Sequence, residues 1–180
     1  MNDGKAPAAY SSIARVLHWI TAALVLTTIP IAVAMVNEKP GPLQDFLYNL
    51  HRSIGAVIIP LVIVRLGYRL THPPLPLPDD IPPLQARAAR ATHWALYVLL
   101  IVQPFLGWVA TSAYGAPIIV FGLFQLPPIW PQDQPLSERL FPVHQLIGLA
   151  IACLAILHIS AALYHHFIRK DRVLLRMITG

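Results

Sequence analysis

The sequence predicts an all-α membrane protein, a bundle of four transmembrane helices, and composition and charge placement lead to this fold class. The 180-residue chain is 56% hydrophobic and only 12% charged, and its mean hydropathy is +0.60, outside the usual range of soluble domains. A spanning helix needs about 20 mostly apolar residues, so the chain has room for about four with their connections. The charges lie at the ends of the apolar runs, where long side chains reach the membrane surface. We therefore expect one membrane domain over residues 1–180, with membrane lipid rather than nucleic acid as the partner of its +5 net charge.

The first two predicted helices are residues 13–36 and 44–70. The first carries no formal charge beyond Arg15, and the short polar link after it forces the second helix to return antiparallel. The second is uncharged only between Arg52 and Arg65, so a spanning helix here must hold Arg52 at or near the interface.

The second half of the chain holds two further predicted helices, residues 87–112 and 138–168. Six prolines in residues 71–83 predict a stiff, extended connector before the third helix. Residues 114–137 interrupt the apolar pattern, and their apolar part, 117–126, is too short to cross a bilayer. We expect a loop there that lies on the interface or dips into it.

The distribution of cations predicts the orientation. Ten of the 13 Lys and Arg residues lie in the N-terminal flank with the start of the first helix, in the second connection with the adjoining helix ends, or in the C-terminal tail. The other three, Lys39, Arg52 and Arg139, lie on the opposite side. The positive-inside rule then places both termini in the cytoplasm.

Four of the eight histidines lie in apolar segments and are followed, one helical turn later, by glycine or alanine, which leaves room for a flat macrocycle against the helix. A single buried imidazole can simply be packed and hydrogen-bonded, but four with this feature indicate ligands. The remaining histidines, His72, His93, His165 and His166, are followed by proline or a large side chain. The four candidate ligands are His18, His51, His144 and His158.

Depth in the membrane pairs these candidates. His144 and His158 are fourteen residues apart, so they project from nearly one helix face about 21 Å apart along the axis. His51 and His144 lie about two turns inside the outer ends of their helices and form the outer pair. For the inner pair, two reference points disagree. Counted in residues from the outer ends of the helices, His18 lies at the depth of His158. Counted from the nearest cytoplasmic cations, His18 lies at the depth of His165. We expect His158, because the short first connection fixes the outer boundary and the last helix can extend into the cytoplasm.

Two imidazole pairs at separate depths favour two haems over a zinc or copper site. Zinc and copper sites need three or four converging ligands, usually including cysteine or carboxylate, whereas haem iron needs only two axial ligands. Cys153 is the only cysteine, which excludes the CxxCH attachment motif and predicts non-covalent haem b. With histidine at both axial positions, the iron serves one-electron transfer. Arg52 beside His51 and Arg15 near His18 are candidate partners of haem propionates, or else ordinary interfacial anchors.

Several motifs carry a resemblance to a known family. They are Arg15-Val16-Leu17-His18-Trp19, the two histidines on the last predicted helix, the connection 114–126, and the tail from His165-His166 to Met177. Together they make nearly the whole chain similar to the bacterial cytochrome b561 family, which includes the cytochrome b subunits of membrane hydrogenases and formate dehydrogenases. In that family the fourth helix ligates both haems, which agrees with the pairs above.

The resemblance implies a multi-pass oxidoreductase of the bacterial inner membrane that exchanges electrons with quinone. Superoxide oxidation coupled to ubiquinone reduction is known among free-standing members. Lys39, Arg52 and Arg139 are candidates to draw such an anion to the outer face, or else are ordinary surface residues or partners of propionates. The alternative function is a haem-bearing anchor subunit that relays electrons from a partner dehydrogenase or hydrogenase to quinone. His93, next to Trp94, is a candidate neighbour of quinone or of an inner propionate, or else a packed helix-end histidine.

Overall fold

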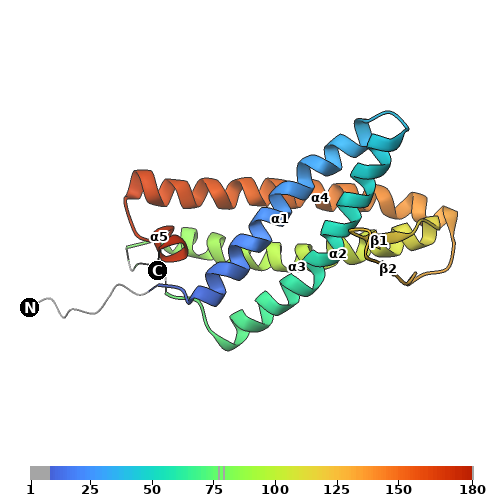
Figure 1. Cartoon of the computed structure of the whole chain (residues 1–180). Coiled ribbons are helices and arrows are strands. Elements are labelled where there is room, and N and C mark those ends of the chain that lie inside the picture. The colour runs from blue at the N-terminus through green and yellow to red at the C-terminus, as the bar shows by residue number, and fades with distance from the viewer. Residues whose placement is uncertain (1–8, 77, 79, 180) are drawn as a thin grey trace, which may run out of the picture.

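The computed structural model describes residues 9–76, 78 and 80–179 and is dominated by four long helices (Figure 1). Each of them is long and apolar enough to cross a membrane, which confirms the predicted four-helix membrane fold. The helices are α1 (Ser12–Asn37), α2 (Pro42–Thr71), α3 (Pro83–Tyr114) and α4 (Gln134–Tyr164).

The helices begin slightly before the predicted ranges because their N-termini carry good starting residues. The Ser11 side chain accepts a hydrogen bond from the Ala14 amide at 3.2 Å, as expected of an N-cap. Helices α2 and α3 begin at Pro42 and Pro83, since proline has no amide hydrogen to leave unsatisfied in the first turn. The Asp133 carboxylate caps α4.

The expected interfacial loop contains a small antiparallel hairpin, β1 (Ile118–Val120) and β2 (Phe124–Leu126). The strands are joined by residues 121–123, and the Leu123 amide donates to the Val120 carbonyl at 2.9 Å. Phe121 and Gly122, the central residues of this turn, both have positive φ, 47° and 74°, as the tight turns of hairpins often require. The hairpin lies at the end of the bundle where α3 ends (Figure 1), and the Phe121 amide donates to Ser53 Oγ on α2 at 2.9 Å. Strands of three residues are too short to show an alternating pattern in the sequence.

At the other end, α4 passes into a π-helical turn, His165–Arg169, and the chain then folds back into the short helix α5 (Leu175–Ile178). The Trp19 indole donates to the Met177 carbonyl at 2.9 Å. Helix α5 and the start of α1 therefore lie together at one end of the bundle (Figure 1).

Close backbone contacts join α1 to α2, α2 to α3 and α3 to α4, but within the described ranges they are scarce between α4 and either α1 or α2.

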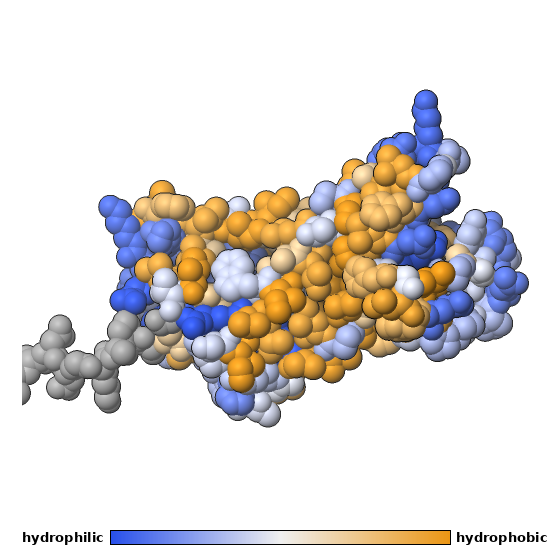
Figure 2. Space-filling model, viewed as in Figure 1, coloured by the Kyte–Doolittle hydropathy of each residue, from blue (hydrophilic) through white to orange (hydrophobic). Residues whose placement is uncertain are grey.

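A hydrophobic band covers most of the visible surface between hydrophilic ends (Figure 2). Inside the bundle, a compact apolar cluster occupies the middle. The cluster lies between the two histidine levels, since Ile151 is midway between His144 and His158. Its members are Val25, Ile54, Ile58, Val62, Tyr97, Leu100 and Ile151.

Candidate metal centres in the helix bundle

The histidine level that the cation distribution predicts to lie near the outer face, called the outer level, joins α2 to α4. The ring centroids of His51 and His144 are 6.1 Å apart, with an angle of 81° between the ring planes. The two imidazoles thus approach each other although the backbones of α2 and α4 stay apart. Their equal depth along the two helices agrees with the predicted pairing.

The inner level joins α1 to α4. The ring centroids of His18 and His158 are 6.2 Å apart. His165, the alternative partner of His18, instead lies with its Nδ1 2.5 Å from the Asp171 carboxylate. The structure therefore brings His158 rather than His165 to His18.

The two separations fit pairs of imidazoles that would hold one metal ion between them. An imidazole nitrogen lies about 2.0 Å from a metal that it binds, with the ring centre about 1 Å further, so rings on opposite sides of one iron have centroids about 6 Å apart. Within the part of the chain that the structure describes, no three His, Cys, Asp or Glu side chains converge to hold a metal ion. The donor set thus suits a cofactor that brings four ligands of its own.

Three glycines shape the outer level. A Cβ at Gly55, one turn after His51, would meet nothing within 4 Å, which agrees with the expected space beside that ligand. At Gly148 a Cβ would lie 3.2 Å from Gln103 Nε2, and at Gly107 it would lie 2.8 Å from His144 Cε1. Gly107 therefore makes room for the His144 ring, a role that its place in the α3 sequence did not reveal.

The second ring nitrogens of the outer pair differ in their surroundings. His51 Nδ1 lies 3.2 Å from the Thr28 hydroxyl, an oxygen that can accept its hydrogen and so leave Nε2 free for a metal. Among the described residues, buried His144 Nδ1 has no hydrogen-bond partner, although Gln103 Nε2 donates to the His144 carbonyl at 2.8 Å. Thr28 carries no sequence signal, because it meets His51 only through the packing of α1 on α2.

The three predicted neighbours of the haems occupy different places. Arg52 donates to the Pro117 carbonyl at 3.4 Å, so it ties α2 to the hairpin. Arg15 donates to Ser12 Oγ at 3.3 Å, and its buried Nη1 has no partner within residues 9–76, 78 and 80–179. His93 enters the inner level, with its ring centroid 5.2 Å from that of His158.

Arg65 reaches the inner level although its sequence position did not suggest it. Its Nη2 lies 2.7 Å from His18 Nδ1, and its guanidinium lies 5.3 Å from the centroid of the Tyr97 ring. The contact with His18 joins residues far apart in the sequence and depends on the reach of a long side chain, which helix spacing alone does not give.

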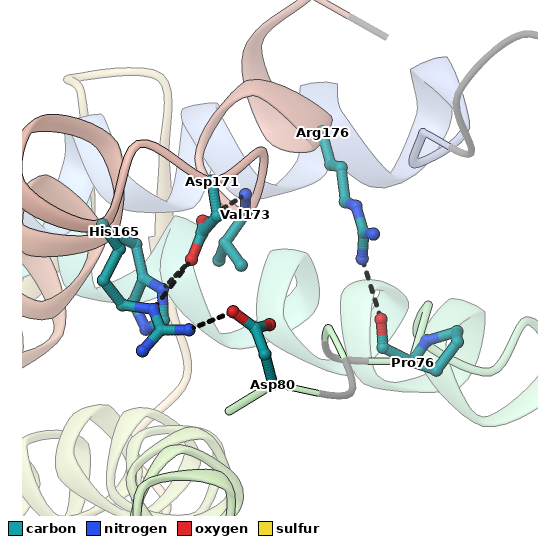
Figure 3. Close-up of polar contacts among 7 residues, drawn as sticks. Pro76, Asp80, His165, Asp171, Val173 and Arg176 are labelled. Carbon is teal, nitrogen blue, oxygen red and sulfur yellow. Dashed lines mark hydrogen bonds and ion pairs between the residues drawn. The ribbon is translucent and has the colours of Figure 1, made fainter. Parts of the chain in front are cut away.

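A polar network holds the tail against the inner end of the bundle (Figure 3). Asp171 accepts from Arg169 Nε at 3.3 Å, and Arg169 Nη2 lies 2.7 Å from the Asp80 carboxylate. Burial raises the pKa of the Asp171 carboxyl, but the hydrogen bonds from His165 and the Val173 amide outweigh it and hold that pKa below its ordinary value. Farther along the tail, Arg176 donates to the Pro76 carbonyl at 2.8 Å, so the tail also fixes the connector.

Comparison with known proteins gives consistent matches over almost the whole chain. Residues 9–180 match the family described as prokaryotic cytochrome b561. The chain is 32% identical to cytochrome b561 homolog 2 of Escherichia coli, over 99% of this chain and 95% of that protein. It is 29% identical to the probable superoxide oxidase CybB of Yersinia pestis, over 94% and 95% of the two chains, and 29% identical to a cytochrome b562 of Cereibacter sphaeroides, over 94% of each.

Proposed function

Because this chain belongs to the prokaryotic cytochrome b561 family and is thus a membrane electron-transfer protein, we propose that it binds two b haems and exchanges electrons with quinone. In this proposal the axial ligands are His51 with His144 at the outer level and His18 with His158 at the inner level. The membrane is the bacterial inner membrane, with both termini in the cytoplasm.

The observation that carries this proposal is the pair of centroid separations, 6.1 Å and 6.2 Å. Both match two imidazoles on opposite sides of one iron, and both pairs use α4. His93 is closer to His158, at 5.2 Å, which is short for a trans pair. His93 is therefore assigned as a neighbour of the inner site and not as a ligand.

The protein's own groups hold and insulate the two sites. Haem b bound at each level would supply one-electron chemistry with no open position on the iron. Thr28 orients the His51 ring, and the apolar cluster around Ile58 and Ile151 keeps water away from the space between the levels.

An inner groove supports quinone binding. A cavity of about 380 Å³ lies between α1 and α5, lined by Ser12, Arg15, Val16, Trp19, Ile20 and Ile178. The apolar walls suit an isoprenoid chain, and the unpartnered Nη1 of Arg15 is a donor for a quinone oxygen. In this assignment ubiquinone takes electrons at the inner end of the bundle.

The outer donor in this proposal is superoxide, which the name of the Yersinia relative suggests. The outer connections carry Glu38, Asp45, Asp133 and Glu138 besides their three cations, so attraction of an anion depends on local charge rather than on the whole face. Arg52, one residue from His51, is the cation nearest to the outer pair in sequence.

The test is electron transfer by the purified chain alone. The chain is mixed with a superoxide source and a ubiquinone analogue, and quinol formation is measured beside a His158→Ala variant as the inactive control. We expect quinol formation that depends on His158. Two bound haems without quinone reduction, together with co-purification of an outer-face redox subunit, would identify the anchor-subunit function instead.

A further inference from the structure

Arg65 occupies on α2, one level deeper, the place that His51 occupies at the outer level. The two residues are fourteen apart in the sequence, the same spacing that separates His144 from His158 on α4. Fourteen residues are close to four helical turns, so both side chains project from nearly one face of α2, about 21 Å apart along its axis. At the inner level α2 thus offers a guanidinium where it offers an imidazole at the outer level.

This guanidinium has no carboxylate partner among the described residues, whose ion pairs all involve Asp80 or Asp171 at the tail. Its contacts are His18 Nδ1 at 2.7 Å and the face of Tyr97 at 5.3 Å. A charged side chain within a membrane helix is costly and is retained where it pairs with an opposite charge or serves a site. Arg65 therefore lacks the anion that its position requires.

The contact with His18 is also incompatible with ligation by that ring. A guanidinium only donates hydrogen bonds, so while Arg65 donates to Nδ1, the neutral His18 ring carries its hydrogen on Nε2. A neutral imidazole that binds a metal through Nε2 has its hydrogen on Nδ1 and donates it to an acceptor. Ligation by His18 and the Arg65 contact are thus alternatives.

From these observations, and on the basis of the proposed function, we infer that Arg65 is the binding residue for a propionate of the inner haem. A carboxylate is the acceptor that matches the planar fork of the guanidinium. Arg65 then leaves His18 Nδ1 when that ring ligates, and its charge is compensated by the propionate. Arg69, one turn further on, lies over Trp94 and Tyr97 and makes no such contact with a histidine among the described residues.

The test compares Arg65→Gln, Arg65→Lys and the matched control Arg69→Gln by redox titration of the purified holoprotein. The inner haem is identified as the one lost in His18→Ala. Removing a nearby positive charge disfavours the reduced form, so in Arg65→Gln we expect the ratio of reduced to oxidised inner haem at a fixed potential to fall at least tenfold, which is 59 mV for one electron. The outer haem should keep its potential, and Arg65→Lys and Arg69→Gln should shift the inner haem by less than threefold.

Resonance Raman spectra give a second readout, because the propionate bending mode reports hydrogen bonds to that group. This mode should shift in Arg65→Gln and stay unchanged in Arg69→Gln. Loss of the inner haem from Arg65→Gln but not from Arg65→Lys would also support the inference. Two haems with unchanged potentials and an unchanged propionate mode in Arg65→Gln would overturn the inference, because the charge and hydrogen bonds of Arg65 would then not act on a propionate. Absence of haem from the wild-type protein would instead overturn the proposed function.

Discussion

Gly107→Ala gives a sharp test of the outer site. A Cβ at this position would lie 2.8 Å from His144 Cε1, whereas carbon atoms in contact prefer about 3.5–4.0 Å. The ring would have to retreat by about 0.7 Å, which exceeds the tolerance of about 0.5 Å for a positioned ligand. Outer-haem binding should therefore fail in this variant.

The expected effect on stability is small, which makes haem content the better measurement. Overpacking costs about 1–3 kcal/mol, and replacing glycine by alanine within a helix returns about 0.5–1 kcal/mol. The variant should fold, with a free energy of unfolding lowered by about 2.5 kcal/mol or less. Haem per chain should fall from two towards one, measured by the pyridine haemochrome assay.

The matched control is Gly67→Ala, where a Cβ would meet nothing within 4 Å. This variant should keep both haems and melt at or slightly above the wild-type temperature. Two haems per Gly107→Ala chain, with an unchanged reduced spectrum, would refute the assignment of His144 as a ligand in the observed ring position.

Three further predictions concern the support of the outer ligand and the docking of the tail. Thr28→Val removes the hydroxyl 3.2 Å from His51 Nδ1, so haem retention on dilution should weaken by about 10–100-fold. Thr28→Ser should retain haem as the wild type does, and equal retention by Thr28→Val and the wild type would exclude a role of Thr28 in orienting His51. Asp171→Asn weakens the contact with His165, so trypsin should cut the tail faster with unchanged haem spectra; an unchanged cutting rate would contradict this. Because the folded pKa of Asp171 is lowered, its contribution is complete above the ordinary Asp pKa of about 3.9 and is lost as pH falls through the lowered value. The ratio of tail hydrogen-exchange rates between Asp171→Asn and the wild type at the same pH should therefore fall towards one only below about pH 4, and a ratio of one at pH 6 would argue against this role.

The main features of the site follow from helix periodicity. The equal depth of His51 and His144 could be predicted because 1.5 Å per residue and 3.6 residues per turn fix both height and direction along a straight helix. The choice between His158 and His165 was harder, since two reference points in the sequence disagreed. In the structure His158 faces His18, because α4 ends at Tyr164 and the π-helical turn carries His165 to Asp171.

Other features depend on contacts that a linear sequence does not encode locally. The hairpin 118–126 depends on a turn with positive φ at a phenylalanine, which phenylalanine adopts rarely. Arg65 meets His18, and Gly107 admits the His144 ring, only once the helices are packed. Glycine also occurs in apolar helices at bends and at close helix approaches, so its presence in α3 does not by itself indicate a contact with a ring.

The most direct test of the account is the haem content of the purified chain, measured with a reduced-minus-oxidised spectrum. We predict two low-spin b haems per wild-type chain, one haem in each single substitution of a ligand, and the same inner haem lost from His18→Ala and His158→Ala. His166→Ala should keep both. A wild-type chain with one haem or none, or a His165→Ala variant that loses the inner haem while His158→Ala keeps it, would contradict the central claim.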